Sequence, residues 1–88
     1  MILKAKHILV THEFEAKDIL KKIEQGEEFE KLARDFSLCP SSKAGGDLGE
    51  FKRGMMVPPF EKALLALDSG EISSIVRTQF GYHIIKRL

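Results

Sequence analysis

One stretch of the sequence, residues 37–60, follows neither helical nor strand periodicity and so limits how the rest of the chain can fold. It contains all three prolines, the single cysteine and four of the seven glycines. Proline fixes the backbone and lacks an N–H donor, while glycine permits conformations that other residues resist. We therefore predict a long irregular segment, with the main regular elements before and after it.

Before this stretch, the apolar pattern predicts one strand and two helices. Residues 2–10 end in an unbroken apolar run, which is typical of a central strand covered on both faces. In residues 12–25 apolar residues recur at helical spacing, with Thr11 as the expected N-cap and Gly26 just after the end. Residues 27–36 repeat the helical pattern, so both helices are expected to pack on one core.

From the irregular stretch onward, the pattern predicts a helix and two strands. Residues 49–51 form at most a short edge strand, and Pro59 suits the first turn of a third helix. Strands are expected at 72–78 and 82–88, joined by a short hairpin connection. This order predicts a single α+β domain over residues 1–88, with a small antiparallel sheet.

Charge and composition narrow the range of ligands. The net charge is +1 with acidic and basic residues interspersed, so neither nucleic acid nor a membrane surface is an expected partner. No apolar run reaches the roughly 20 residues of a membrane span. The only Cys and the three His residues lack the spacing of a metal site, and one Cys cannot form an internal disulfide. We expect no metal and no cofactor.

The reactive candidates are Cys39, His7 and His83, and the residues alone leave their role open. A cysteine with two histidines is compatible with a nucleophilic site. A lone cysteine is more often a small buried apolar residue, and a histidine on an apolar strand is more often a satisfied core group. The Met and Phe residues of the irregular stretch are likewise more often core than pocket.

Five motifs, taken together and in order, resemble the parvulin family of peptidyl-prolyl cis/trans isomerases. They are KHILV at 6–10, SLCPS at 37–41, GGDLGEF at 45–51, GMMVPPF at 54–60 and QFGYHIIK at 79–86. The resemblance covers essentially the whole chain. It implies a parvulin-like (FKBP-like) four-stranded antiparallel sheet surrounded by three to four helices, and an enzyme that rotates Xaa-Pro bonds in protein substrates.

The resemblance also implies a site, with the two histidines side by side on neighbouring strands. The implied catalytic residues are His7, Cys39, Thr78 and His83, and the implied proline-pocket residues are Leu48, Phe51, Met56, Phe60 and Phe80. Our hypothesis is that Cys39 tunes the electronics of the substrate carbonyl without being an obligatory covalent nucleophile. The histidines are expected to orient the polar network and to set the protonation of Cys39.

Substrate and context follow from further details. Parvulins that require phosphorylated substrates carry a basic cluster after the first strand, whereas residues 11–15 hold two acids and no Lys or Arg, so we expect no phosphate requirement.

Expected partners are unfolded or partly folded proteins with Xaa-Pro bonds. We expect a monomer, and a cytoplasmic one because Met1 leads directly into the first strand. The alternative is a weakly catalytic or non-catalytic chaperone module that binds Pro-containing unfolded segments. A cysteine hydrolase is disfavoured because no oxyanion motif is recognisable.

Overall fold

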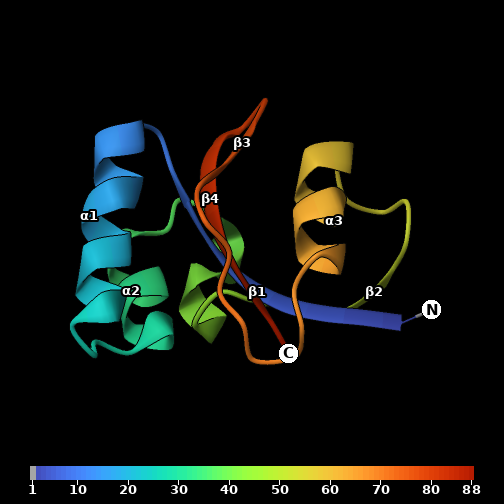
Figure 1. The fold of residues 1–88 in the computed structure, drawn as a ribbon, viewed down its shortest axis with the longest axis horizontal. Helices are drawn as coiled ribbons and strands as arrows, with labels where there is room; N and C mark the ends of the chain where they lie inside the picture. The colour runs from blue at the N-terminus through green and yellow to red at the C-terminus, as the bar shows by residue number, and fades with distance from the viewer. Residues whose placement is uncertain (1) are drawn as a thin grey trace.

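A computed structural model describes residues 2–88, which form one four-stranded antiparallel sheet with helices on both faces (Figure 1). The strands are β1 (Ile2–Val10), β2 (Asp47–Lys52), β3 (Val76–Thr78) and β4 (Gly81–Arg87). Their spatial order is β2-β1-β4-β3, so β1 and β4 are central. The helices are α1 (Glu13–Glu24), α2 (Phe29–Phe36), α3 (Pro58–Leu65) and a 3-10 helix, η1 (Pro40–Ala44). The predicted fold class and the central position of β1 are confirmed.

The two faces of the sheet carry separate apolar clusters. Even-numbered residues such as Ile8 and Ile84 pack under α1 and α2, and odd-numbered residues such as Ala5 and Ile85 pack under α3. This follows from the alternation of side chains along a strand. It explains why the end of β1 is apolar at consecutive positions. Both strand histidines have odd numbers, so both belong to the α3 face.

Several element ends differ from the sequence predictions for local reasons. The N-cap of α1 is His12 and not Thr11, because the Glu15 carboxylate reaches back to accept the His12 N–H at 3.1 Å. The turn expected near Pro40 is the start of η1, which ends at Gly45 with a φ of 70°. The edge strand β2 is longer than residues 49–51.

Strand β3 is shorter than the predicted 72–78 because Ser73 interrupts the ladder with β4. Its hydroxyl accepts the Ile85 N–H at 2.9 Å, and only an isolated bridge pairs Ile72 with Lys86. Regular pairing resumes at Val76. Within residues 2–88, no helix combines the length and hydropathy that crossing a membrane requires.

Candidate active site

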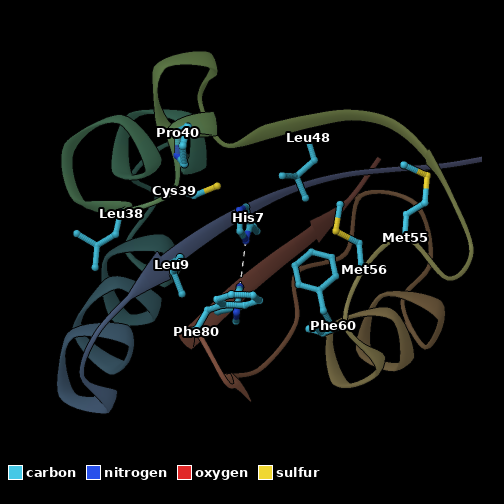
Figure 2. Close-up of a pocket in the computed structure, with 12 residues that line it drawn as sticks. His7, Leu9, Leu38, Cys39, Pro40, Leu48, Met55, Met56, Phe60 and Phe80 are labelled. Atoms are coloured by element: carbon cyan, nitrogen blue, oxygen red, sulfur yellow. Dashed lines mark hydrogen bonds between the residues drawn. The ribbon is translucent and has the colours of Figure 1, made fainter.

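His7 on β1 and His83 on β4 form the floor of the candidate site. His7 pairs with Ile85 and His83 pairs with Leu9, which makes the histidines diagonal neighbours on one face of the sheet. Their Nδ1 atoms lie 3.1 Å apart, the contact drawn as a dashed line from His7 in Figure 2. The side chains are only 5% and 3% exposed. The structure thus places the two histidines side by side, while their part in catalysis stays a prediction.

The histidine pair is neutral at pH 7. Burial, reinforced by repulsion from His83, lowers the pKa of His7 to about 4, and burial also lowers the pKa of His83. A neutral imidazole has one N–H and one bare nitrogen, so one Nδ1 can donate to the other across 3.1 Å. Two charged rings could not make this contact, because each Nδ1 would carry a proton.

Thr78 extends this hydrogen-bonded chain on the far side of His83. Its Oγ1 lies 2.6 Å from His83 Nε2 and also accepts the Phe80 N–H at 3.1 Å. At the other end of the chain, His7 Nε2 is buried and has no hydrogen-bond partner among residues 2–88. The tautomer of one imidazole therefore determines the tautomer of the other. Thr78 links the histidine pair to the β3–β4 hairpin, which carries Phe80.

An apolar pocket of about 440 Å³ opens above the histidines. The Phe60 ring stands edge-on to both imidazoles, with centroids 5.5 Å apart. In the view of Figure 2, Leu48, Met56 and Phe60 lie to one side of His7 and Cys39 lies to the other. The volume falls in the range of small-ligand pockets. The described lining residues are His7, Leu9, Leu38, Cys39, Pro40, Leu48, Met55, Met56, Val57, Phe60, Phe80 and His83.

Most of the residues predicted for the site meet in this pocket, but two lie elsewhere. Thr78 reaches the site only through His83. Phe51 does not line the pocket and is buried in the core under α3. The reason is its register, because Phe51 pairs with Leu3, four residues before His7 and roughly 13 Å away along an extended strand.

Five lining residues were not among those predicted: Leu9, Leu38, Pro40, Met55 and Val57. Strand alternation could have identified Leu9, which shares a face with His7. The others lie beside predicted residues, on irregular backbone or, for Pro40, at the first residue of η1, where no periodicity indicates direction. For Cys39, the structure shows a partly exposed free thiol on the pocket wall and no hydrogen bond to either histidine among the described residues.

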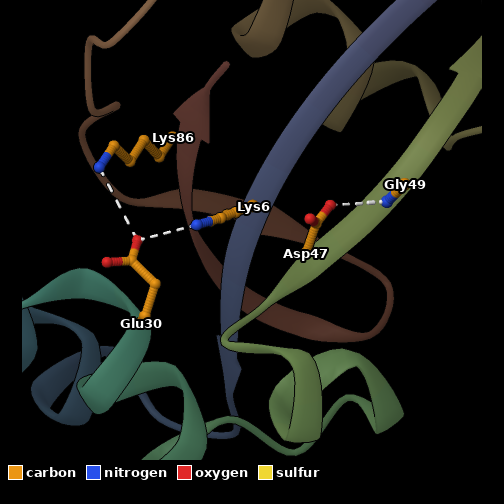
Figure 3. A network of polar contacts seen from close by, with 5 residues as sticks. All are labelled: Lys6, Glu30, Asp47, Gly49 and Lys86. Atoms are coloured by element: carbon orange, nitrogen blue, oxygen red, sulfur yellow. Dashed lines mark hydrogen bonds and ion pairs between the residues drawn. The ribbon is translucent and has the colours of Figure 1, made fainter.

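Two cations on the central strands, Lys6 beside His7 and its pairing partner Lys86 on β4, point away from the pocket. Lys6 and Lys86 reach the Glu30 carboxylate on α2 at 3.2 Å and 3.8 Å, as Figure 3 shows. Partial burial acts to raise the pKa of Glu30, but the hydrogen bond from Lys6 and the two positive charges outweigh it and lower the pKa. The network ties α2 to both central strands. In the same figure, Gly49 donates its N–H to Asp47 at 2.8 Å.

None of the described residues that line the pocket is Lys, Arg, Asp or Glu. In residues 2–88, no group of three or more His, Cys, Asp or Glu side chains is arranged to hold a metal ion. The arrangement therefore offers an apolar cup with a neutral polar floor. Such a site can bind a small ring beside an amide without placing a full charge next to it.

Comparison with known proteins gives the family. The profile described as "Rotamase: PPIC-type PPIASE domain" matches residues 5–88. The foldase protein PrsA of Caldanaerobacter subterraneus subsp. tengcongensis is 51% identical over 86 residues, which are 97% of this chain and 28% of that protein. PrsA of Bacillus subtilis is 48% identical over 86 residues, with 97% and 30% covered. The chain thus spans less than a third of these curated relatives.

Solved structures agree in fold. The crystal structure of the peptidylprolyl isomerase PrsA from Bacillus anthracis superposes with a TM-score of 0.96 at 49% identity, over 98% of this chain and 40% of that one. The solution structure of NmPin, the parvulin of Nitrosopumilus maritimus, has a TM-score of 0.87 at 48% identity, over 99% of this chain and 95% of that one. The chain belongs to the PPIC-type peptidyl-prolyl cis/trans isomerases, the parvulin family that its motifs resemble.

Proposed function

We propose that this chain catalyses rotation about Xaa-Pro bonds in unfolded or partly folded proteins and so assists their folding. The observation that carries the proposal is the buried neutral pair His7–His83 at the floor of an apolar pocket. Membership of the isomerase family supports the same reaction.

The reaction makes modest demands on the protein. Amide resonance sets a rotational barrier of about 18–20 kcal/mol, and no covalent bond has to break. An acceleration of about 10⁴-fold requires the transition state to be stabilised over the ground state by only about 5–6 kcal/mol. The twisted amide has lost resonance and carries less charge on its oxygen, so a poorly polar site favours it relative to water.

Each part of the site has a task in this scheme. We assign Leu48, Met56 and Phe60 to holding the proline ring, and Cys39 to contacting the carbonyl that turns, because all four line the pocket. The neutral pair His7–His83 supplies polarity without a full positive charge. A cation beside the carbonyl oxygen would stabilise the planar, charge-separated amide, so the lowered histidine pKa values favour rotation.

We also propose that substrates need no phosphorylated residue before proline. None of the described residues that line the pocket is Lys or Arg, and the segment 11–15 after β1 is acidic. A phosphate group would find no bidentate or ammonium partner there. Isomerisation rates of matched peptides with and without phosphoserine before proline test this. A strong preference for the phosphorylated peptide would contradict the proposal.

The residue before proline is proposed to be apolar or broadly tolerated. Leu38, Met55 and Phe80 surround the pocket opening with 64%, 67% and 60% of their surface exposed. An apolar substrate side chain that covers these residues buries apolar surface, which favours binding, whereas a charged side chain finds no partner among them. The proposed clients are therefore apolar, proline-containing segments of incompletely folded chains.

The same exposed rim favours a second candidate, a chaperone module that holds such segments with little or no turnover. A protease-coupled assay with a prolyl peptide separates the two functions. Acceleration over the uncatalysed rate supports the isomerase, whereas binding of the peptide without acceleration at micromolar protein supports the chaperone. A monomeric state and a cytoplasmic location remain predictions, and a sedimentation mass near 9.9 kDa would support the former.

A further inference from the structure

The pocket wall that carries Cys39 is attached to an edge of β1 that the sheet leaves open. Strand β2 stops pairing with β1 at Lys6. Beyond that residue, none of the described strands pairs with β1 on this side. Unpaired backbone groups at a sheet edge either lose a hydrogen bond or attract another chain. The segment 37–46 covers them, although it is not a strand.

This segment is fixed to β1 at both ends. At one end, Gly46 accepts the His7 N–H at 3.0 Å, and a Cβ at Gly46 would lie 2.5 Å from the His7 carbonyl oxygen. At the other end, the Ser37 hydroxyl accepts the Leu9 N–H at 3.1 Å, while the Leu38 N–H donates to the Leu9 carbonyl at 2.8 Å. The two attachments are two residues apart on β1.

The Ser37 hydroxyl has a second contact that bears on the site. It also lies 3.4 Å from the backbone nitrogen of Cys39, which donates to it. One side-chain oxygen thus joins the strand of His7 to the backbone of Cys39. Leu38, Cys39 and Pro40, the three residues directly after Ser37, all line the pocket.

We propose that Ser37 is a positioning residue, whose hydroxyl holds the Cys39 wall against β1 at the distance from the histidine floor that the proline ring requires. The expected effect on catalysis rests on the proposed isomerase function. The attachment of the wall to β1 does not depend on that function. Ser37 touches no reacting atom, and it acts through Cys39 and Leu9.

Two substitutions isolate the hydroxyl. Ser37→Ala removes the acceptor of both N–H groups, whereas Ser37→Thr keeps it. Ser37 has φ −71° and ψ 136°, an extended conformation that suits a β-branched side chain. Ser73→Ala is the matched control, because it also removes a hydroxyl that accepts a backbone N–H, at 2.9 Å, but that N–H belongs to β4 and the wall is bonded to β1.

Amide hydrogen exchange, followed by NMR, tests the attachment without reference to activity. In Ser37→Ala, exchange at Leu9 and Cys39 should accelerate about five- to thirtyfold, the change that one or two lost hydrogen bonds produce. Exchange at His7, whose acceptor is Gly46, should rise less. Labelling of the Cys39 thiol by a soluble disulfide should accelerate with it, and Ser37→Thr should restore both rates.

The catalytic consequence is measured separately with a prolyl peptide. The value of kcat/KM should fall more in Ser37→Ala than in Ser73→Ala and should recover in Ser37→Thr. Unchanged exchange and labelling at Leu9 and Cys39 in Ser37→Ala would overturn the proposal, as would equal losses of kcat/KM in the two alanine variants. If the wild-type chain does not accelerate isomerisation, the proposed function fails, and the exchange rates still decide whether Ser37 holds the wall.

Discussion

Acidification should destabilise this fold through the buried pair His7–His83. Burial, with repulsion from His83, lowers the pKa of His7 from 6.5 to about 4. The unfolded chain therefore binds more protons than the folded chain between these two pH values. The free energy of unfolding is highest above about pH 6.5 and decreases as the pH falls below it, because unfolding then takes up a proton.

The size of the effect follows from the pKa of His7. Where only the unfolded imidazole is protonated, the free energy of unfolding changes by about 1.4 kcal/mol per pH unit. From about pH 6.5 to about pH 5 this amounts to about 2 kcal/mol, and the lowered pKa of His83 adds to it in the same direction. Ordinary carboxylates stay mostly ionised in this range, so the buried histidines set the slope.

Urea denaturation at several pH values between 5 and 7 measures this slope. The variant His7→Leu should make it shallower and leave the part that His83 contributes, since one of the two titrating groups is gone. Ser73→Ala should lower stability at every pH and keep the wild-type slope, since it removes a hydrogen bond and no titrating group. A wild-type free energy of unfolding that is equal at pH 7 and pH 5 would refute the idea of a buried neutral pair.

Two further predictions concern the wall of the pocket. Cys39→Ser should retain substantial isomerase activity, because the thiol is proposed to tune the carbonyl and not to attack it, whereas a thiohemiacetal adduct trapped on Cys39 and seen by mass spectrometry would count against this. Gly46→Ala should lose more than about 2 kcal/mol of stability, since a Cβ there would meet the His7 carbonyl oxygen at 2.5 Å and φ is +88°. Urea midpoints measure that loss, and a variant as stable as wild type would show that the segment 37–46 can move away from β1.

The predictions that succeeded rest on short-range patterns. The unbroken apolar run at the end of β1 indicated a central strand, and β1 is central in the sheet. Helical spacing located α1 and α2 to within a few residues, and Pro59 marked the first turn of α3. For β1, α1 and α2 the physical cause, burial of one side or both sides of an element, leaves a regular trace in the sequence.

The features that local patterns did not predict depend on contacts between residues distant in sequence. His7 and His83 are 76 residues apart, and only the family resemblance brought them together. The start of β3 is set by Ser73 bonding to Ile85, and Phe51 is kept from the pocket by its pairing with Leu3. Such contacts depend on which strands pair and at which residues, and the pattern within a single strand does not name its distant partner.

The most direct test is the isomerisation rate of a panel of peptides that differ in the residue before proline, measured with the wild-type chain and with Met56→Ala. Met56 lines the pocket, and its truncation removes about three heavy atoms that are proposed to contact the proline ring. The account predicts clear acceleration by wild type, strongest or evenly high for apolar residues before proline, and about a ten- to thirtyfold lower kcat/KM for the folded variant. No acceleration at micromolar wild-type protein, or equal rates for the two chains, would contradict it.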